Sequence, residues 1–255
     1  MYSNSYPTDK ESIKITMADI KMAAQLGFKV YRTGIFRKED VDILTACLPL
    51  AEELGIQIGT EIHTPRGIHT WWTQDWLEVV MRTGSPAAGF VPDFAIFSTG
   101  LSMSAWKKMV RAGAKDEVLK KIDEAMRAGE TLKPEDVEKL GGGPVEIGFV
   151  SRPKFFIYDD PKWLKEVLPY SKHIHGKFFE MTEVNGVDIE PSIDYENAMK
   201  VLVEENWDGF ITSEYEGQRD YFDQGCDIVM DAVDQVTRHH KMLRYFEQKA
   251  KDAMI

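Results

Sequence analysis

The chain has 255 residues, of which 43% are hydrophobic, and it carries a formal net charge of −11 at pH 7. A chain of this length can bury a sizeable core as one large domain. The negative charge argues against nucleic acid or an anionic membrane as a partner. No apolar run reaches the ~20 residues that a membrane-spanning helix needs.

The two cysteines, Cys47 and Cys226, lie in helix-like patterns. We expect them to be reduced core residues rather than a disulfide. The first ten residues, "MYSNSYPTDK", contain no apolar signal region. These features predict a cytoplasmic location.

Helices and strands alternate in the first part of the chain. Thr16 and Asp19 resemble a capping box, which predicts a short helix that ends at Gly27. The patterns then predict a strand at 28–32, a helix at 38–54 that ends at Gly55, and a strand at 56–63. A helical stretch is predicted after Trp76 and a short strand at 88–94. This order is typical of parallel βα units.

Roughly eighty residues separate Asp93 from His173, more than a short connection with one helix requires. They include a charged helical run near 115–128 and the breaker "GGGP" at 141–144. The apolar segment that follows, "VEIGFVSRPKFFIY", fits either a strand or a packed loop. We predict that an insertion at about 95–170 covers an active site.

The last part of the chain returns to the βα pattern. The sequence predicts a strand at 173–181, "HIHGKFFEM", and a helix at 195–205. A further strand is predicted at 209–217 and a long amphipathic helix at 225–247. Polar residues concentrate at the carboxyl ends of the strands, where parallel α/β folds place their chemistry.

Four consecutive strands end in a residue that can bind a metal: Glu61, Asp93, His175 and Glu214. Three carboxylates that converge without a cation would repel one another and raise their pKa values. A divalent cation removes this repulsion. Oxygen-rich ligation with one imidazole favours Mn²⁺ or Mg²⁺ over structural zinc.

Strand alternation places further polar side chains near these ligands. His63 shares a face with Glu61, His173 and Lys177 share a face with His175, and Glu216 shares a face with Glu214. We expect His173 to order the site by hydrogen bonds and Lys177 to lie nearer the substrate.

Each of these residues also has a simpler interpretation. A strand-end glutamate is commonly solvated or salt-bridged, His173 can be a core histidine, and Lys177 can pair with Glu180 or another carboxylate. The pair His239 and His240 is predicted to lie on the surface. Recurrence on four successive strands favours the metal site over these alternatives.

Three further residues, His69, Trp71 and Trp72, leave two interpretations open. They fit ordinary packing and an aromatic wall for a ring-shaped ligand equally well.

The motifs "LGFKVYR", "EIHTP", "VPDFAIF", "HIHGKFFEM" and "SEYEG" resemble those of the xylose-isomerase-like TIM barrels, the sugar isomerase/epimerase superfamily. Within it, the chain is most similar to the α subunits of C-glycoside deglycosidases. The resemblance implies a divalent metal, with Mn²⁺ favoured, held by Glu61, Asp93, His175 and Glu214.

The resemblance also raises a question about completeness. In the family these ligands come from the fifth to the eighth strand, but the pattern predicts only one strand before Glu61, at 28–32. We therefore expect residues 1–255 to form a single α/β-barrel domain that lacks the first three βα units of a (β/α)8 barrel. Either a second chain supplies the missing strands, or a shortened chain depends on assembly. The family's deglycosidases also pair with a small β subunit.

The implied activity is cleavage of the sugar–aryl carbon–carbon bond of a 3-oxo-C-glycoside, with a sugar or aryl glycoside as the small-molecule partner. The metal would bind the 3-oxo group and acidify the proton on C2, which a base removes before the aryl carbon leaves. We expect His63 to be the acid/base group and Lys177 to steady the developing oxyanion. We expect Glu216 and His173 to contact the substrate.

Three alternatives accompany this interpretation. A keto-sugar isomerase or epimerase would use Glu61 and Glu214 as proton-transfer bases. An endonuclease-type phosphodiesterase is disfavoured by the acidic charge and by the single imidazole in the predicted cluster. A non-catalytic subunit that retained the fold is favoured by the incomplete barrel.

Overall fold

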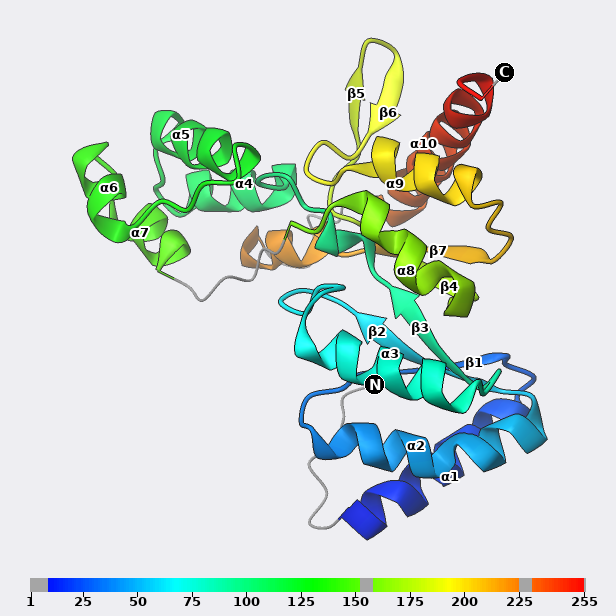
Figure 1. The fold of residues 1–255 in the computed structure, drawn as a ribbon. Helices are drawn as coiled ribbons and strands as arrows, with labels where there is room; N and C mark the ends of the chain where they lie inside the picture. The colour runs from blue at the N-terminus through cyan, green and yellow to red at the C-terminus, as the bar shows by residue number, and fades with distance from the viewer. Residues whose placement is uncertain (1–8, 152–157, 225–230, 255) are drawn as a thin grey trace. The chain divides into compact units, whose positions relative to one another are not determined.

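The computed structural model describes residues 9–151, 158–224 and 231–254, which form two compact units (Figure 1). The first unit comprises Met1–Asp93, Lys162–His175 and Asn206–Thr212. The second comprises Phe94–Pro161, Gly176–Glu205 and Ser213–Ile255.

The first unit begins as the predicted alternation of helices and strands. Its elements are α1 (Asp9–Gln25), β1 (Val30–Thr33), α2 (Glu39–Leu54), β2 (Gln57–Ile62), α3 (Trp71–Thr83) and β3 (Ala88–Pro92). The three strands form a parallel sheet in the order β1-β2-β3. β2 and β3 are almost fully buried, which explains why their sequences are rich in apolar and small residues.

Two glycines show why this sequence fits the fold. Gly55 ends α2 in the left-handed conformation, with φ of 66°, as its position after the apolar pattern predicts. Gly89 lies in β3, where an added Cβ would come within 2.2 Å of the Tyr170 carbonyl oxygen. Only glycine allows the backbone of the following segment to approach β3 this closely.

That segment contains η2 (Pro161–Trp163), α8 (Leu164–Val167) and η3 (Leu168–Tyr170), and it leads into β4 (His173–Phe178). Isolated parallel bridges join Phe90 to Ser171 and Asp93 to His175, so β4 follows the direction of β3.

β4 pairs in turn with β7 (Phe210–Tyr215). The Phe210 N–H donates to the Lys172 carbonyl and the Glu216 N–H to the Phe178 carbonyl, so the two strands advance together, as parallel strands do.

The second unit contains the insertion and the end of the chain. Its helices and strands are η1 (Phe94–Ile96), α4 (Met103–Arg111), α5 (Asp116–Arg127), α6 (Pro134–Lys139), α7 (Pro144–Val150), β5 (Thr182–Val184), β6 (Val187–Ile189), α9 (Tyr195–Glu204), η4 (Gly217–Gln224) and α10 (Ala232–Asp252). β5 and β6 form an antiparallel hairpin that the sequence pattern did not predict.

The insertion has a small hydrophobic core of its own. Its buried residues are Leu101, Met109, Ala114, Val118, Leu119, Ile122 and Val137. Burial of these side chains explains why the charged run near 115–128 folds as the amphipathic helix α5.

The first part of the apolar segment after "GGGP" is a helix, rather than the strand or packed loop that we predicted. Pro144 starts the helix α7, and the Glu146 carboxylate accepts a hydrogen bond from the Gly143 N–H at 3.1 Å. Proline at the first helical position and a carboxylate three residues beyond the cap favour a helix start. The rest of that prediction, at 152–157, lies outside the described residues.

Three predicted helix starts were also wrong. α1 begins at Asp9, so Thr16 lies inside the helix rather than at its cap. α3 begins at Trp71. α10 begins at Ala232, and residues 225–230 lie outside the described range.

The structure also bears on the state of the cysteines and on membrane-spanning helices. Cys47 is a buried free thiol, as predicted, whereas Cys226 lies outside the described residues. Of the helices in the described ranges, none combines the length and apolar character needed to span a bilayer.

Candidate metal centre

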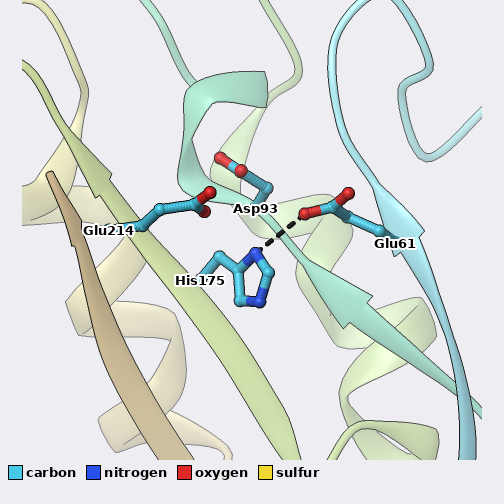
Figure 2. A group of neighbouring side chains, drawn as sticks. All are labelled: Glu61, Asp93, His175 and Glu214. Atoms are coloured by element: carbon cyan, nitrogen blue, oxygen red, sulfur yellow. Dashed lines mark ion pairs between the residues drawn. The ribbon is translucent and has the colours of Figure 1, made fainter. Parts of the chain in front are cut away.

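The structure brings the four predicted ligands together. One ligand atom from each of Glu61, Asp93, His175 and Glu214 lies within 4.8 Å of the other three. Figure 2 shows the four side chains gathered around one space, with the ion pair between His175 and Glu61 dashed. Glu61 and Glu214 lie near the carboxyl ends of β2 and β7, and Asp93 directly follows β3. His175 lies within β4 rather than at its end, where we had predicted it, but it forms a parallel bridge with Asp93 and so reaches the same site.

Glu61 is held from two sides. Its Oε1 lies 2.8 Å from His175 Nδ1, and its Oε2 accepts a hydrogen bond from Arg32 Nη1 at 3.0 Å. Burial raises the pKa of Glu61, but the hydrogen bond from His175 and the charge of Arg32 outweigh it, so the pKa is lowered. Glu61 is therefore an ionised carboxylate, the form that binds a metal.

Asp93 and His175 come from neighbouring positions of the sheet. Asp93 follows the last residue of β3 and is fully buried, with an exposed fraction of 0%. Its N–H donates to the Ile62 carbonyl at 3.0 Å, which extends the pairing of β2 with β3 and fixes the backbone at the ligand. His175 is also buried and bridges Asp93 through the backbone.

His63 lies next to this group in a defined tautomer. Its Nδ1 lies 2.7 Å from the Thr64 carbonyl oxygen. Because a carbonyl can only accept, Nδ1 carries the proton and Nε2 keeps its lone pair. Nε2 lies 3.8 Å from Asp93 Oδ2, and the side chain is 30% exposed. The ring can therefore accept a proton from a molecule at the site.

Lys177 pairs with two carboxylates, as its simpler interpretation predicted. Its Nζ lies 3.0 Å from Glu214 Oε1 and 2.9 Å from Glu216 Oε1, and its side chain is 1% exposed. Glu216 Oε2 also meets Arg219 Nη2 at 2.6 Å. Lys177 therefore orients the predicted ligand Glu214 from a buried position.

Glu180 contacts residues of the insertion and of η4. It forms an ion pair with Lys107 and accepts a hydrogen bond from the Tyr221 hydroxyl at 2.8 Å.

His173 lies at the start of β4, beside His175. The two rings meet edge to face with centroids 5.1 Å apart, and His173 Nε2 lies 2.7 Å from Thr212 Oγ1 on β7. These contacts fit the predicted ordering role.

The aromatic residues after β2 contact other rings and charges. His69 packs on Trp163 with ring centroids 4.1 Å apart and pairs with Glu166 at 2.8 Å, while Trp71 stacks on Trp72 at 4.8 Å. These contacts fit ordinary packing, and the aromatic-wall interpretation stays a prediction.

Sequence reasoning missed two residues. It passed over Arg32, a charged residue inside a predicted strand that holds Glu61. It placed His239 on the surface, which was wrong, because His239 has an exposed fraction of 0%. The signal for burial was present, since His239 shares a buried face of α10 with the apolar residues Met242, Phe246 and Ala250.

The donor set fits a divalent cation. Bonds from Mg²⁺ to oxygen measure ~2.0–2.1 Å, so ligands on opposite sides of such an ion lie about 4.2 Å apart. The four atoms here, within 4.8 Å of one another, need to contract only slightly. Three carboxylates and one imidazole, without sulfur, suit Mn²⁺ or Mg²⁺.

Comparison with known proteins identifies similar sequences. No protein-family model matches the chain. The 3'-dehydrocarminate deglycosidase alpha subunit of Microbacterium sp. is 28% identical over 87% of this chain and 65% of its own length. A C-glycoside deglycosidase alpha subunit of Arthrobacter globiformis is 30% identical over 81% of this chain and 59% of its own length. The chain thus spans less than two thirds of these relatives.

A solved structure shows the fold. A D-tagatose 3-epimerase-like protein superposes with a TM-score of 0.50 at 13% identity, covering 96% of this chain and 72% of its own. The resemblance inferred from the sequence is confirmed: the chain is similar to C-glycoside deglycosidase alpha subunits, and its fold is similar to that of a D-tagatose 3-epimerase-like protein.

Proposed function

We propose that this chain is a metal-dependent lyase that cleaves the sugar–aryl carbon–carbon bond of 3-oxo-C-glycosides. The observation that carries the proposal is the cluster of Glu61, Asp93, His175 and Glu214 in a chain related to C-glycoside deglycosidase α subunits. A divalent metal, Mn²⁺ in our proposal, would polarise the 3-oxo group when bound and so acidify the proton on the neighbouring C2.

The protein's own groups would move the protons. His63 Nε2 accepts the proton from C2, because Nδ1 is already committed to the Thr64 carbonyl. The electron pair from the C2–H bond forms the C1–C2 double bond as the C1–aryl bond breaks. The aryl carbon takes up a proton and leaves as the free aglycone. The products are the arene and an unsaturated 3-oxo sugar.

Other side chains would orient the site. Lys177 holds Glu214 and Glu216, and we propose that Lys177 also steadies negative charge on the substrate oxygen. Glu216 and His173 are proposed to contact the sugar. The insertion is proposed to cover the site, which fits the contact of its helix α4 with η4, directly after Glu216.

A keto-sugar isomerase or epimerase is the second candidate. It is favoured by the presence of two glutamates, Glu61 and Glu214, in one cluster. Two carboxylates from different strands could exchange protons with opposite faces of a sugar.

The partners also belong to the proposal. The relatives are named alpha subunits, which supports a small β subunit for this chain too. We further propose that additional strands, from this or another polypeptide, pair with the open edge of β1. The cytoplasmic location stays a prediction.

Product analysis tests this function. The complex purified from its native host is incubated with a 3-oxo aryl C-glycoside, with Mn²⁺ or with a chelator. We expect release of the free aglycone with Mn²⁺ and its loss with the chelator. Epimerisation of a free ketose without aglycone release would favour the second candidate, and metal-independent release would contradict the mechanism.

A further inference from the structure

A buried histidine contacts side chains of β4 and β7, the strands that carry Lys177 and Glu214. His239 on α10 has an exposed fraction of 0%, and Tyr195 on α9 has one of 1%. The imidazole stacks on the Phe178 ring, with centroids 4.3 Å apart and an interplanar angle of 9°. Both ring nitrogens have partners: Nδ1 lies 2.8 Å from Ser213 Oγ, and Nε2 lies 2.7 Å from the Tyr195 hydroxyl.

The hydrogen bonds fix the position of each proton. The Tyr195 hydroxyl donates to the Lys177 carbonyl oxygen at 2.7 Å, and a carbonyl can only accept. The hydroxyl has then used its proton, so His239 Nε2–H must donate to the Tyr195 oxygen. Nδ1 of the neutral ring is left as an acceptor, and Ser213 donates to it.

The neutral form fits the surroundings of the ring. Burial, with a smaller effect from the charge of His240, lowers the pKa of His239 to about 3. At neutral pH each hydrogen bond therefore keeps its donor: Ser213 donates to His239, His239 donates to Tyr195, and Tyr195 donates to the backbone carbonyl of Lys177.

The two ends of this network lie on the two strands that carry the site. Ser213 precedes Glu214 on β7, and alternation points its side chain away from the face of Glu214 and Glu216. At the other end, Tyr195 holds the backbone of Lys177, whose Nζ contacts both glutamates. A shift of the imidazole would displace Lys177 relative to Glu214.

We propose that His239 is a positioning residue that sets the geometry of Glu214 and Lys177 through Ser213 and Tyr195, and thereby the affinity of the site for its metal. This inference rests on the proposed metal site. It does not depend on the reaction that the site performs.

The tautomer is the first test. Nitrogen-detected NMR of the histidine rings in metal-free protein should show His239 protonated at Nε2 alone from pH 7 to pH 5, with assignment by His239→Gln. Protonation at Nδ1, or of both nitrogens, would overturn the network. His240 is exposed on the same helix and provides the internal reference for the assignment.

The second test measures Mn²⁺ binding by calorimetry. His239→Phe retains the ring that stacks on Phe178 but removes both hydrogen bonds, and Tyr195→Phe removes only the hydroxyl. We expect each to weaken Mn²⁺ binding about 10-fold or more, as changes of groups that orient ligands typically do. His239→Gln, which keeps a donor and an acceptor, should recover part of the loss, and His240→Gln should bind as the wild type does.

Unchanged Mn²⁺ affinity in Tyr195→Phe would overturn the proposal even if His239→Phe failed to fold. Neither test uses a sugar, so the outcome is separate from that of the proposed function. A protein that shows the coupling but releases no aglycone would contradict only the lyase.

Discussion

Glu61 illustrates how a carboxylate stays ionised where little water reaches it. One oxygen meets His175 and the other meets Arg32, so the charge is shared between two partners. Oε1 therefore faces the other three ligands, and Arg32 fixes the orientation of the carboxylate through Oε2. A metal that displaces the His175 contact would find Glu61 already oriented.

His175 provides the only imidazole among the four clustered ligands. We expect His175→Ala to lose stoichiometric Mn²⁺, because removal of one of four ligands leaves three carboxylates with weaker binding and stronger repulsion. Elemental analysis of the purified variant measures this. His240→Ala is the matched control, and one metal per chain in His175→Ala would show that the ligand assignment is wrong.

His63 is expected to act on protons rather than on the metal. His63→Ala should retain Mn²⁺ and lose turnover by on the order of 10²–10⁴-fold, the usual contribution of a general acid or base. Steady-state rates and metal content, measured on the same sample, separate the two roles. An intact rate would move the role to another group, with Lys177 and Glu216 the next candidates.

His239 should also make stability depend on pH. A histidine in the unfolded chain has a pKa of about 6.5, whereas burial in the folded protein lowers the pKa of His239 to about 3. Between these values the unfolded state binds more protons, so the free energy of unfolding falls as pH decreases, by up to ~1.4 kcal/mol per pH unit. This contribution is fully present above pH ~6.5.

Urea denaturation between pH 7 and pH 4 measures that slope. His239→Phe should be less stable at pH 7 but should show a flatter decline with acid, since it lacks the titrating group. His240→Gln should keep the wild-type slope. Equal slopes in wild type and His239→Phe would mean that the imidazole does not resist protonation.

At the scale of elements, helix α4 of the insertion anchors the segment that follows β7. Arg111 donates to both oxygens of Asp223, at 3.0 and 2.8 Å, and to the Asp220 carbonyl at 2.6 Å, while Ser104 donates to the Asp220 carboxylate at 2.8 Å. Planar two-point pairing of this kind fixes orientation as well as distance. The insertion thus controls the segment immediately after Glu216.

Hydrogen exchange can detect this anchor. Arg111→Ala should speed amide exchange in η4 (Gly217–Gln224) several-fold, because α4 would no longer hold that segment by the paired contacts. Lys121→Ala is the control, since the partner of Lys121 is Glu124 of its own helix. Unchanged exchange in η4 would show that other contacts are sufficient to order it.

The helices and strands also show which parts of the structure could be predicted from sequence patterns. The strands and their ligand-bearing ends could be predicted because alternation and burial are local properties of a strand. The helix α7 could not, since the apolar run "VEIGFV" fits several structures until its proline and its Glu146 cap are considered together. His239 was misplaced because a histidine pair was considered without the apolar stripe of α10.

At the largest scale, two parallel strands, β1 and β7, have a neighbouring strand on one side only among the described residues. In the part of the chain that the structure describes, β1 pairs only with β2 and β7 only with β4. Apolar side chains are exposed in the segment that leads into β1 and at the start of β7: Met22 at 56%, Leu26 at 65%, Phe28 at 58% and Phe210 at 79%. Open parallel edges beside exposed apolar groups favour association with another polypeptide.

We therefore predict that the functional protein is an assembly. Size-exclusion chromatography with light scattering should give a mass above the 29.1 kDa of one chain. The excess mass should correspond to partner polypeptides or to a second copy. A stable and active species of 29.1 kDa would contradict this prediction.

We propose that Glu61, Asp93, His175 and Glu214, from four strands, jointly hold one catalytic metal ion. Anomalous diffraction at the manganese edge, from crystals of the complex grown with Mn²⁺, tests it most directly. We predict one strong peak within bonding distance of Glu61, Asp93, His175 and Glu214. A manganese peak elsewhere, with none among these four side chains, would contradict the account.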